Sequence, residues 1–564
     1  MRKFNILAFA CLTSALAANA NAQLALPAGV EETVLAKSPF STGLLTARDG
    51  ALDTGIWQGA KVDDLIFLLR AAPTRPVTPA IGDGLRRVLL SSADAPLEAS
   101  TELDGAKLMT LARLGFIEEA RTIASLSSAP LSDPQVGQAL AIADLSEDKL
   151  DDACARGQRI TSGRDNPFWV KLRVVCYMAA DETDAADLTL ALLRESGALS
   201  LDEQVLFEAL VTGAELKAPP KVHTAIDLAV RGLINAPVAP SVLEKADGGV
   251  VVSIARNEAV DLQLRLAAAV EAVALGIMPR SEFVALFDAI SFEPKELADA
   301  QTAITRGPTK ILNDAKIFQV VRQMQAPEFL RDKATLIAAA LGAADSLPRA
   351  QALSTLYGPD IKALEGALLA PEEAGKFALA NLALGDAAAA SRWLNMMAGG
   401  GLSSLDEATA MEAIRLVNFL ALMDPEAAIP VAASANVEIL DPRAPGDSAL
   451  DVNDETTARL VMSILDAATD RIEGQAALTA IAASDADGLA NPLMRAIIDR
   501  ALNIANVPDL AGRVRFETAW RDDFESSANV IYGASFGDAE EPLQAIPISA
   551  EEKAFGPRLK PSNN

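Results

Sequence analysis

The sequence has a single histidine, His223, and this scarcity limits the chemistry that the chain can perform. A histidine-based metal site or a hydrolytic relay needs further ligands or a paired nucleophile, and a lone histidine near a helix is usually a surface or packing residue. The sequence also lacks a glycine-rich loop ending in Lys-Ser or Lys-Thr, which excludes the common phosphate-binding loop. We therefore predict no catalytic residue, no metal site and no cofactor.

Aromatic residues are also rare, at 4% of the chain, although half of its 564 residues are hydrophobic. Alanine and leucine supply most of the hydrophobic residues. Because alanine has the highest helix propensity and lets helices approach closely, we predict an all-α fold. A chain of this length is expected to form several domains or one elongated array.

Long apolar runs are missing beyond the amino end. A membrane-spanning helix needs about 18–20 uninterrupted apolar residues. The best later candidate, residues 262–278, contains Arg265 and Glu271. We predict no membrane span.

The amino end itself has the features of an export signal. Arg2 and Lys3 precede an apolar run over residues 6–18, and Ala20-Asn21-Ala22 has the small-x-small pattern of a cleavage site. We predict cleavage between Ala22 and Gln23, which makes the mature protein periplasmic or secreted.

The chain has many more acidic residues than basic ones. The formal net charge is −27, and residues 1–22 contain two basic and no acidic residues, so the mature chain carries −29. Nucleic acid and anionic membrane surfaces would be repelled, and we predict neither as a ligand. A basic protein partner is compatible with this charge, although a solvated acidic surface that keeps the protein soluble is the simpler explanation.

Cysteine is limited to three residues, one of which, Cys11, lies inside the signal. Lipoprotein processing at Cys11 would leave only about six apolar residues before it, fewer than the usual 7–15, so we do not expect it. The other two, Cys154 and Cys176, form an even pair in an exported chain and predict a disulfide. They fall on facing helices of consecutive predicted hairpins, where antiparallel packing brings them together. Metal binding by two isolated cysteines is the weaker alternative.

One pattern repeats along the chain: a small residue is followed five positions later by alanine. Within residues 104–218 it recurs at about 33 residues, the period of stacked helical hairpins. The pairs are Gly115…Ala120, Asp148…Ala153, Asp181…Ala186 and Gly213…Ala218, and Gly385…Ala390 repeats the spacing later. We predict that the first residue of each pair is the turn of a hairpin.

The segment Gly115-Phe116-Ile117-Glu118-Glu119-Ala120 resembles the tetratricopeptide (TPR) superfamily, in which a turn glycine precedes by five residues a small alanine where paired helices meet. Aspartate replaces the glycine at 148 and 181, and most aromatic and proline positions of that family are absent. The resemblance covers about 115 residues. It implies an α-solenoid of stacked antiparallel hairpins, an architecture that usually serves as a protein-binding scaffold.

We predict the following organisation. The units are a signal peptide (1–22), an irregular proline-rich N-terminal cap (23–100), a TPR-like array (101–235), irregular helical repeats (236–350), further helical repeats (351–433), a loop or hinge (434–451), a C-terminal helical segment (452–524) and a poorly ordered tail (525–564). One helix is predicted over 252–277, and Gly248 and Gly249 are predicted to interrupt the helices before it. Capping boxes are predicted at Ser200-Leu201-Asp202-Glu203 and Ser404-Leu405-Asp406-Glu407.

Two short segments resemble catalytic motifs. Gly533-Ala534-Ser535-Phe536-Gly537 fits the G-x-S-x-G nucleophile elbow, but only residues 529–532 offer a preceding strand and no histidine follows. Glu525-Ser526 resembles the acid pair of exported lytic transglycosylases, in which a glutamate with a raised pKa protonates a glycosidic oxygen. Only 39 residues follow Glu525, and that family's Gly-Leu-Met-Gln stretch is missing.

Acidic clusters at 451–455 and at Asp485-Ala486-Asp487-Gly488 suggest calcium. The first cluster has Thr456 and Met462 where an EF-hand loop needs glycine and glutamate. Helix N-capping explains these acids more simply.

We predict an exported, non-enzymatic scaffold or adaptor that binds another protein or a peptide in the groove of its hairpins. From the compartment alone, an envelope or motility assembly is the expected setting. A cell-wall enzyme or its regulatory subunit is the alternative, and an envelope spacer that binds divalent cations loosely is a third.

Overall fold

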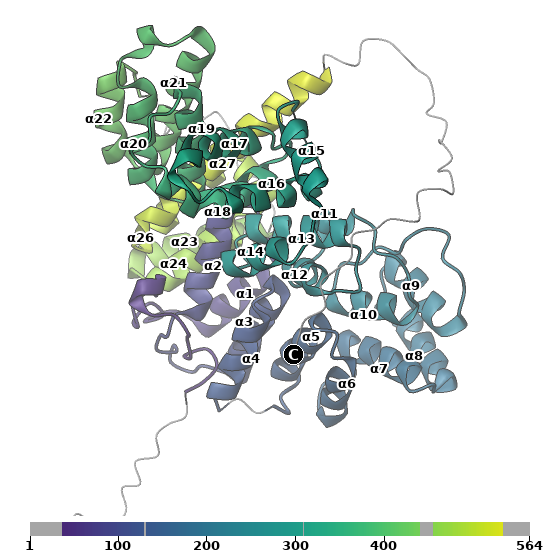
Figure 1. Ribbon diagram of the computed structural model, residues 1–564. Coiled ribbons are helices and arrows are strands. Elements are labelled where there is room, and N and C mark those ends of the chain that lie inside the picture. Colours follow the sequence, from purple (N-terminus) through teal and green to yellow (C-terminus); the bar gives the residue numbers. More distant parts are fainter. Residues whose placement is uncertain (1–36, 129–130, 308, 440–454, 534–564) are drawn as a thin grey trace, which may run out of the picture. The chain divides into compact units, whose positions relative to one another are not determined.

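The computed structural model describes residues 37–128, 131–307, 309–439 and 455–533 (Figure 1). Within these ranges the chain forms 27 α-helices and three short 3₁₀ helices, and no strand. The prediction of an all-α fold of packed helices is confirmed. Among the helices described, none is long and apolar enough to cross a membrane. The predicted signal, its cleavage site at Ala22 and Gln23, and Cys11 lie outside the described residues.

The helices follow one another with short connections. The first ten are α1 (Val62–Ala71), α2 (Pro79–Leu90), α3 (Thr101–Leu114), α4 (Ile117–Leu126), α5 (Pro134–Ser146), α6 (Leu150–Arg159), α7 (Pro167–Ala179), α8 (Thr183–Glu195), α9 (Leu201–Thr212) and α10 (Ala225–Leu233). The middle of the chain forms α11 (Val242–Lys245), α12 (Gly248–Arg256), α13 (Leu262–Ala274), α14 (Arg280–Asp288), α15 (Pro294–Ile304), α16 (Ile311–Gln323), α17 (Leu330–Gly342) and α18 (Leu347–Ala363). The last helices are α19 (Pro371–Ala383), α20 (Ala387–Ala398), α21 (Glu407–Met423), α22 (Pro425–Ala435), α23 (Glu455–Asp470), α24 (Glu473–Ala482), α25 (Ala486–Ala490), α26 (Pro492–Ile504) and α27 (Pro508–Gly533).

Four of the five expected turns share one geometry. Gly115, Asp148, Asp181 and Gly385 all have positive φ, at 103°, 60°, 61° and 78°. In each case the N–H of the following residue donates to the carbonyl oxygen five residues earlier, at 2.8–3.0 Å. This hydrogen bond satisfies a carbonyl at the helix end and reverses the chain.

The alanine after each of these turns lies where the two helices of the hairpin meet. Ala120, Ala153, Ala186 and Ala390 are all 0% exposed. A side chain larger than a methyl group would separate the paired helices, so turn and alanine together define the hairpin.

Two more hairpins have the same turn, with arginine or asparagine in place of the glycine or aspartate of the pattern. Arg471 and Asn506 have φ of 55° and 57°, and Ile472 and Val507 make the same backbone hydrogen bond. Ala476 and Ala511, five positions on, are 0% and 1% exposed. The repeat therefore extends through α23–α24 and α26–α27.

The fifth expected turn differs. Gly213 ends α9 with φ of 69°, but residues 214–224 are not helical, and Ala218 is exposed. Pro219 and Pro220 follow directly, and they can neither donate the backbone hydrogen bonds of a helix nor fit its interior. The next helix starts only at Ala225.

The helix predicted over 252–277 is also two helices, α12 and α13, with Asp261 capping the second. Gly248 and Gly249, predicted as interruptions, open α12 instead. A Cβ atom at Gly248 would lie 2.5 Å from the Leu114 carbonyl oxygen, and one at Gly249 would lie 2.7 Å from that of Ala112. These glycines let α12 approach the end of α3.

The predicted capping boxes have different outcomes. Ser200 and Glu203 form theirs, each side chain accepting from the other residue's N–H. The box at Ser404 is wrong, because the cap is Asp406, which accepts from the N–H of Thr409 at 3.0 Å.

Near the carboxyl end, helices replace two expected irregular segments. Helix α22 continues to Ala435, inside the predicted loop, of which residues 440–451 lie outside the described residues. Helix α27 runs on to Gly533, so residues 529–532 are helical rather than a strand. The rest of the predicted tail, including Ser535, lies outside the described ranges.

The disulfide prediction is confirmed. Cys154 on α6 and Cys176 on α7 are bonded, with their Cα atoms 5.7 Å apart. The bond joins two consecutive hairpins, which share a small core of their own centred on residues such as Trp169, Leu190 and Phe207.

A second, larger core links the two ends of the chain. It contains buried side chains from Phe40 to Trp520. Helix α1 packs against α3 and α24, and α2 packs against α24 and α27 (Figure 1). At the closest point a Cβ atom on Gly474 would lie 2.7 Å from the Trp57 ring, and the Gly474 N–H donates to the Ile56 carbonyl oxygen. The region predicted as an N-terminal cap therefore packs against the C-terminal helices as well as against the array.

Candidate binding groove

The candidate catalytic and calcium-binding residues that the structure describes are exposed or act as helix caps. Glu525 lies on α27 with its side chain 69% exposed and 4.0 Å from Arg521, not in a closed cleft. The His223 side chain is 38% exposed and lies 3.8 Å from Asp202. Asp485 caps α25 by accepting from the N–H of Gly488 at 2.7 Å, as expected for a helix cap. In the part of the chain that the structure describes, no group of three or more His, Cys, Asp or Glu residues could hold a metal ion.

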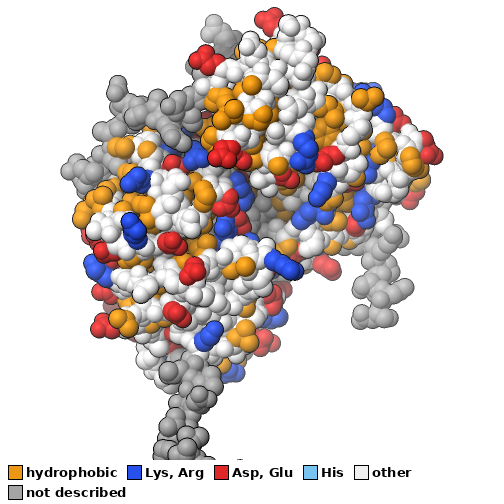
Figure 2. All heavy atoms as spheres, turned by 90° about the vertical axis from the view of Figure 1, so that its left-hand side faces the viewer, with side chains coloured by type: hydrophobic (Ala, Val, Ile, Leu, Met, Phe, Trp, Pro, Cys, Tyr) orange, Lys and Arg blue, Asp and Glu red, His pale blue; other side chains and the backbone are white. Residues whose placement is uncertain are grey.

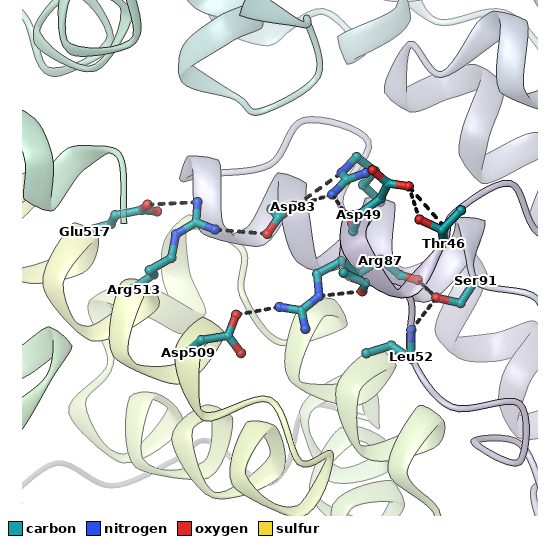
Figure 3. Close-up of polar contacts among 11 residues, drawn as sticks. Thr46, Asp49, Leu52, Asp83, Arg87, Ser91, Asp509, Arg513 and Glu517 are labelled. Atoms are coloured by element: carbon teal, nitrogen blue, oxygen red, sulfur yellow. Dashed lines mark hydrogen bonds and ion pairs between the residues drawn. The ribbon is translucent and has the colours of Figure 1, made fainter. Parts of the chain in front are cut away.

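A polar network joins α2 to α27 (Figure 3). Asp83 pairs with Arg513 at 2.9 Å, and Arg87 pairs with Asp509 at 2.7 Å. Because these charges neutralise one another across the contact, the network fastens the two helices together and does not resemble a ligand site.

A groove crosses the first helices of two consecutive hairpins, and we call it the α1–α3–α5 groove. Its volume is about 250 Å³. Its walls are formed by Leu69, Arg70, Ala72, Thr74, Gly105, Ala106, Met109, Thr110, Arg113, Gln135, Gln138 and Asn166.

Close helix approach shapes the groove. Gly105 on α3 faces Gln135 on α5, and a Cβ atom at this glycine would lie 2.5 Å from the Gln135 Cβ. The missing side chain at Gly105 lets the helices meet and leaves space above them, beside Met109.

Asp247, just before α12, fixes one end of the groove. It accepts from Arg113 Nε at 3.0 Å, from Arg113 Nη2 at 3.2 Å and from Thr74 Oγ1 at 2.6 Å. The guanidinium is thereby held in a fixed orientation, with Nη1 still able to donate to a ligand.

The α5 wall carries two amides, from Gln135 and Gln138. Neither side chain has a hydrogen-bond partner among the described residues, and both line the groove. A primary amide donates and accepts at once, as does a peptide group, so the pair can bind the main chain of an extended segment.

A larger cavity, of about 680 Å³, lies at the ends of α7, α9 and α10. Apolar side chains such as Leu216 and Ile234 and backbone groups line most of it, with Glu215 as its one charged lining residue. It has no fixed polar side chain that would select a ligand.

Surface charge is dispersed on the face shown in Figure 2, where acidic and basic side chains are interspersed with hydrophobic ones. On the described part of that face the net negative charge is not gathered into one block.

Comparison with protein-family models, curated proteins and solved structures finds no match.

The sequence reasoning missed the groove, although one local signal was present. Gln135 and Gln138 stand three residues apart on one face of α5, among the apolar residues of its first turns. The ion pair between Arg113 and Asp247 had no such signal, because 134 positions separate the two residues.

Proposed function

We propose that this protein is an exported, non-enzymatic scaffold of TPR-like helical hairpins that binds an extended segment of another protein in the α1–α3–α5 groove. The observation that carries the proposal is a groove across consecutive hairpins with two unpaired amides on one wall and an oriented guanidinium at one end. Main-chain recognition by such groups suits a peptide in extended conformation.

Three further features support it. The turn and alanine pattern recurs in six hairpins, which is the organisation of a repeat protein. The amino end has the pattern of an export signal. The disulfide suits an oxidising compartment such as the periplasm. An envelope or motility assembly is the setting that we propose from that compartment.

The test is retention of a partner from periplasmic extract on the chain lacking residues 1–22. The groove variant is Met109→Glu with Gln138→Ala, and the control is Gln158→Ala, an exposed glutamine on α6 outside the groove. We expect a protein that the wild type and Gln158→Ala retain and the groove variant loses at least tenfold. Equal retention by all three would reject the groove as the binding site.

Nothing in the described structure favours the cell-wall enzyme, since the Glu525 side chain is exposed. Incubation with peptidoglycan separates the two functions. Release of muropeptides by the wild type, lost in Glu525→Gln, would replace the scaffold proposal with the enzyme.

A further inference from the structure

Helix α8 exposes two large apolar side chains on one of its sides. Leu188 and Leu192 are 67% and 56% exposed. They are spaced four residues apart, so they form one turn of a stripe along the helix. We call these two side chains the α8 face. Neighbouring large apolar side chains on a surface mark interaction sites more often than singly exposed ones do.

The apolar stripe of α8 ends in acids at both sides. Asp184 lies one turn before Leu188, and Glu195 lies about one turn after Leu192. These two carboxylates and that of Asp187 are exposed and have no ion-pair partner in the described part of the chain. Along one side of α8 the order is therefore acid, leucine, leucine, acid.

Helix α8 carries three acids, Asp184, Asp187 and Glu195, and one base, Arg194, which already pairs with Glu208 at 2.8 Å. A cationic partner would gain attraction from the unpaired acids, while an anionic membrane surface would be repelled.

Ion pairs and the disulfide connect the helices around this surface. Arg194 on α8 joins Glu208 on α9, and Lys171 on α7 joins Glu203 on α9 at 2.6 Å with both side chains mostly buried. The Cys154–Cys176 bond fastens α7 to the preceding hairpin. A surface whose helices are already joined needs less ordering when a partner binds.

A groove beside the stripe offers room for an anchoring apolar side chain. Its volume is about 440 Å³, and Val170 of α7 and Leu192 and Leu193 of α8 supply apolar walls, while Asp165 and Arg173 also line it. Leu192 belongs to both the groove and the exposed stripe, so the two surfaces are continuous.

We propose that the α8 face docks a basic amphipathic helix of a partner protein, with apolar side chains at i and i+4 flanked by Lys or Arg. The apolar side chains pack on Leu188 and Leu192, and the flanking cations meet the free carboxylates of α8. This inference rests on the proposed scaffold function and adds a second surface, separate from the α1–α3–α5 groove.

The probe is a fluorescent peptide of about 18 residues made of leucine and lysine, with leucines at i, i+3, i+4 and i+7. A peptide of the same composition in scrambled order carries the same charge and controls for general attraction to an acidic protein. Binding is followed by fluorescence anisotropy with the chain lacking residues 1–22.

Two variants test the face, Leu188→Gln with Leu192→Gln and Asp184→Asn with Asp187→Asn. Matched controls away from it are Met411→Gln with Ile429→Gln, whose side chains are 63% and 61% exposed, and Glu372→Gln with Glu426→Gln. All these positions are exposed, so the variants should fold, which circular dichroism confirms. We expect at least tenfold weaker binding for the leucine variant and a severalfold loss with reduced salt dependence for the acid variant. The controls should bind as the wild type does.

Equal binding of the ordered and scrambled peptides, or equal loss in the control variants, would overturn the proposal. So would a wild-type dimer in sedimentation that the leucine variant abolishes, because a second copy would then occupy the face. The α1–α3–α5 groove variant should leave peptide binding unchanged, so failure here and failure of the groove experiment are separate results.

Discussion

Glu517 on α27 accepts a hydrogen bond from the backbone N–H of Ala80, the second residue of α2, 437 positions earlier in the chain. The distance is 2.7 Å, and the Glu517 side chain is 1% exposed. Burial raises the pKa of this carboxyl group. Its position at the amino end of α2, where unpaired N–H groups and the helix dipole favour an acceptor, makes it the centre of the contact between the two ends of the chain.

Replacement of Glu517 should therefore loosen this contact. Glu517→Ala leaves the buried Ala80 N–H without its acceptor and creates a void, and we expect a loss of about 2–4 kcal/mol. Glu517→Gln keeps an acceptor of similar size and should lose less. The midpoint of thermal unfolding measures both, and an unchanged midpoint for the alanine variant would show that Glu517 does not hold α27 on α2.

Lys107 should make the stability depend on pH. Its Nζ donates to the carbonyl oxygens of Phe40 and Thr42, at 2.9 and 2.8 Å, and burial lowers the pKa of Lys107 from 10.5 to about 7. Between these values the unfolded chain holds the proton and the folded chain does not, so stability rises with pH. We expect the wild-type melting midpoint to rise from pH 7 to pH 9 relative to Lys107→Met.

The control for this titration is Lys61→Met, whose lysine side chain is 75% exposed. It should follow the wild-type pH profile. A Lys107→Met profile parallel to that of the wild type would contradict the assignment.

The pair Asp314 and Arg349 should contribute far more than a surface ion pair. Arg349 donates from Nε and Nη2 to the two carboxylate oxygens of Asp314, both at 2.7 Å, and Asp314 is fully buried. Asp314→Ala leaves a buried guanidinium without its main partner, and we expect a loss of about 3–5 kcal/mol.

Two variants check that this loss comes from the unpaired charge. Glu208→Ala removes the exposed partner of Arg194 and should cost less than about 1 kcal/mol. Asp314→Leu with Arg349→Met removes both charges and should recover much of the stability lost in Asp314→Ala. No recovery in denaturant unfolding would argue that packing, not charge, is lost.

Arg471 is a position where glycine should stabilise the protein. Its φ of 55° strains a residue with a side chain, so Arg471→Gly should gain roughly 0.5–1.5 kcal/mol. Gly115→Ala should do the opposite, because φ is 103° and the new Cβ would lie 3.0 Å from Val252 Cγ2. Arg500→Gly, in the exposed middle of α26, should lose about 1 kcal/mol and controls for a general effect of glycine.

The disulfide should stabilise the hairpins that carry the α8 face. The cysteines are 22 positions apart, and closing a loop of this size contributes about 3 kcal/mol in the chain-entropy account. Cys154→Ser with Cys176→Ser should melt lower and no longer respond to reductant. Two free thiols in non-reducing peptide mapping of the purified, unreduced protein would contradict the bond.

Local sequence predicted the hairpins well because their turns depend on local chemistry. Gly115 and Asp148 were found because glycine and aspartate tolerate positive φ, and Ala120 because helix pairing needs a small side chain. Arg471 was missed because there the packed helices impose a turn that an arginine does not favour, and Asn506 because the pattern considered only glycine and aspartate at the turn, although asparagine also tolerates positive φ.

Contacts between residues far apart in the sequence could not be predicted from hydrophobic patterns or helix propensity. Nothing near Gly248 indicates that it meets the end of α3, and nothing near Asp247 indicates that it orients Arg113. The α1–α3–α5 groove depends on such long-range contacts, so only Gln135 and Gln138 on α5 could have been noticed in the sequence.

The packing of α1 and α2 against α24 and α27 also sets the order in which the protein can be completed. The ribosome makes α1 and α2 first, yet the helices that cover them, and Gly474, against which Trp57 lies, are made last. Until then the surfaces of α1 and α2 that pack on α24 and α27 are uncovered and prone to wrong contacts, which favours slow folding and a need for chaperones. A chain truncated before α24 would keep its early hairpins, but the surfaces of α1 and α2 that pack on α24 and α27 would stay exposed.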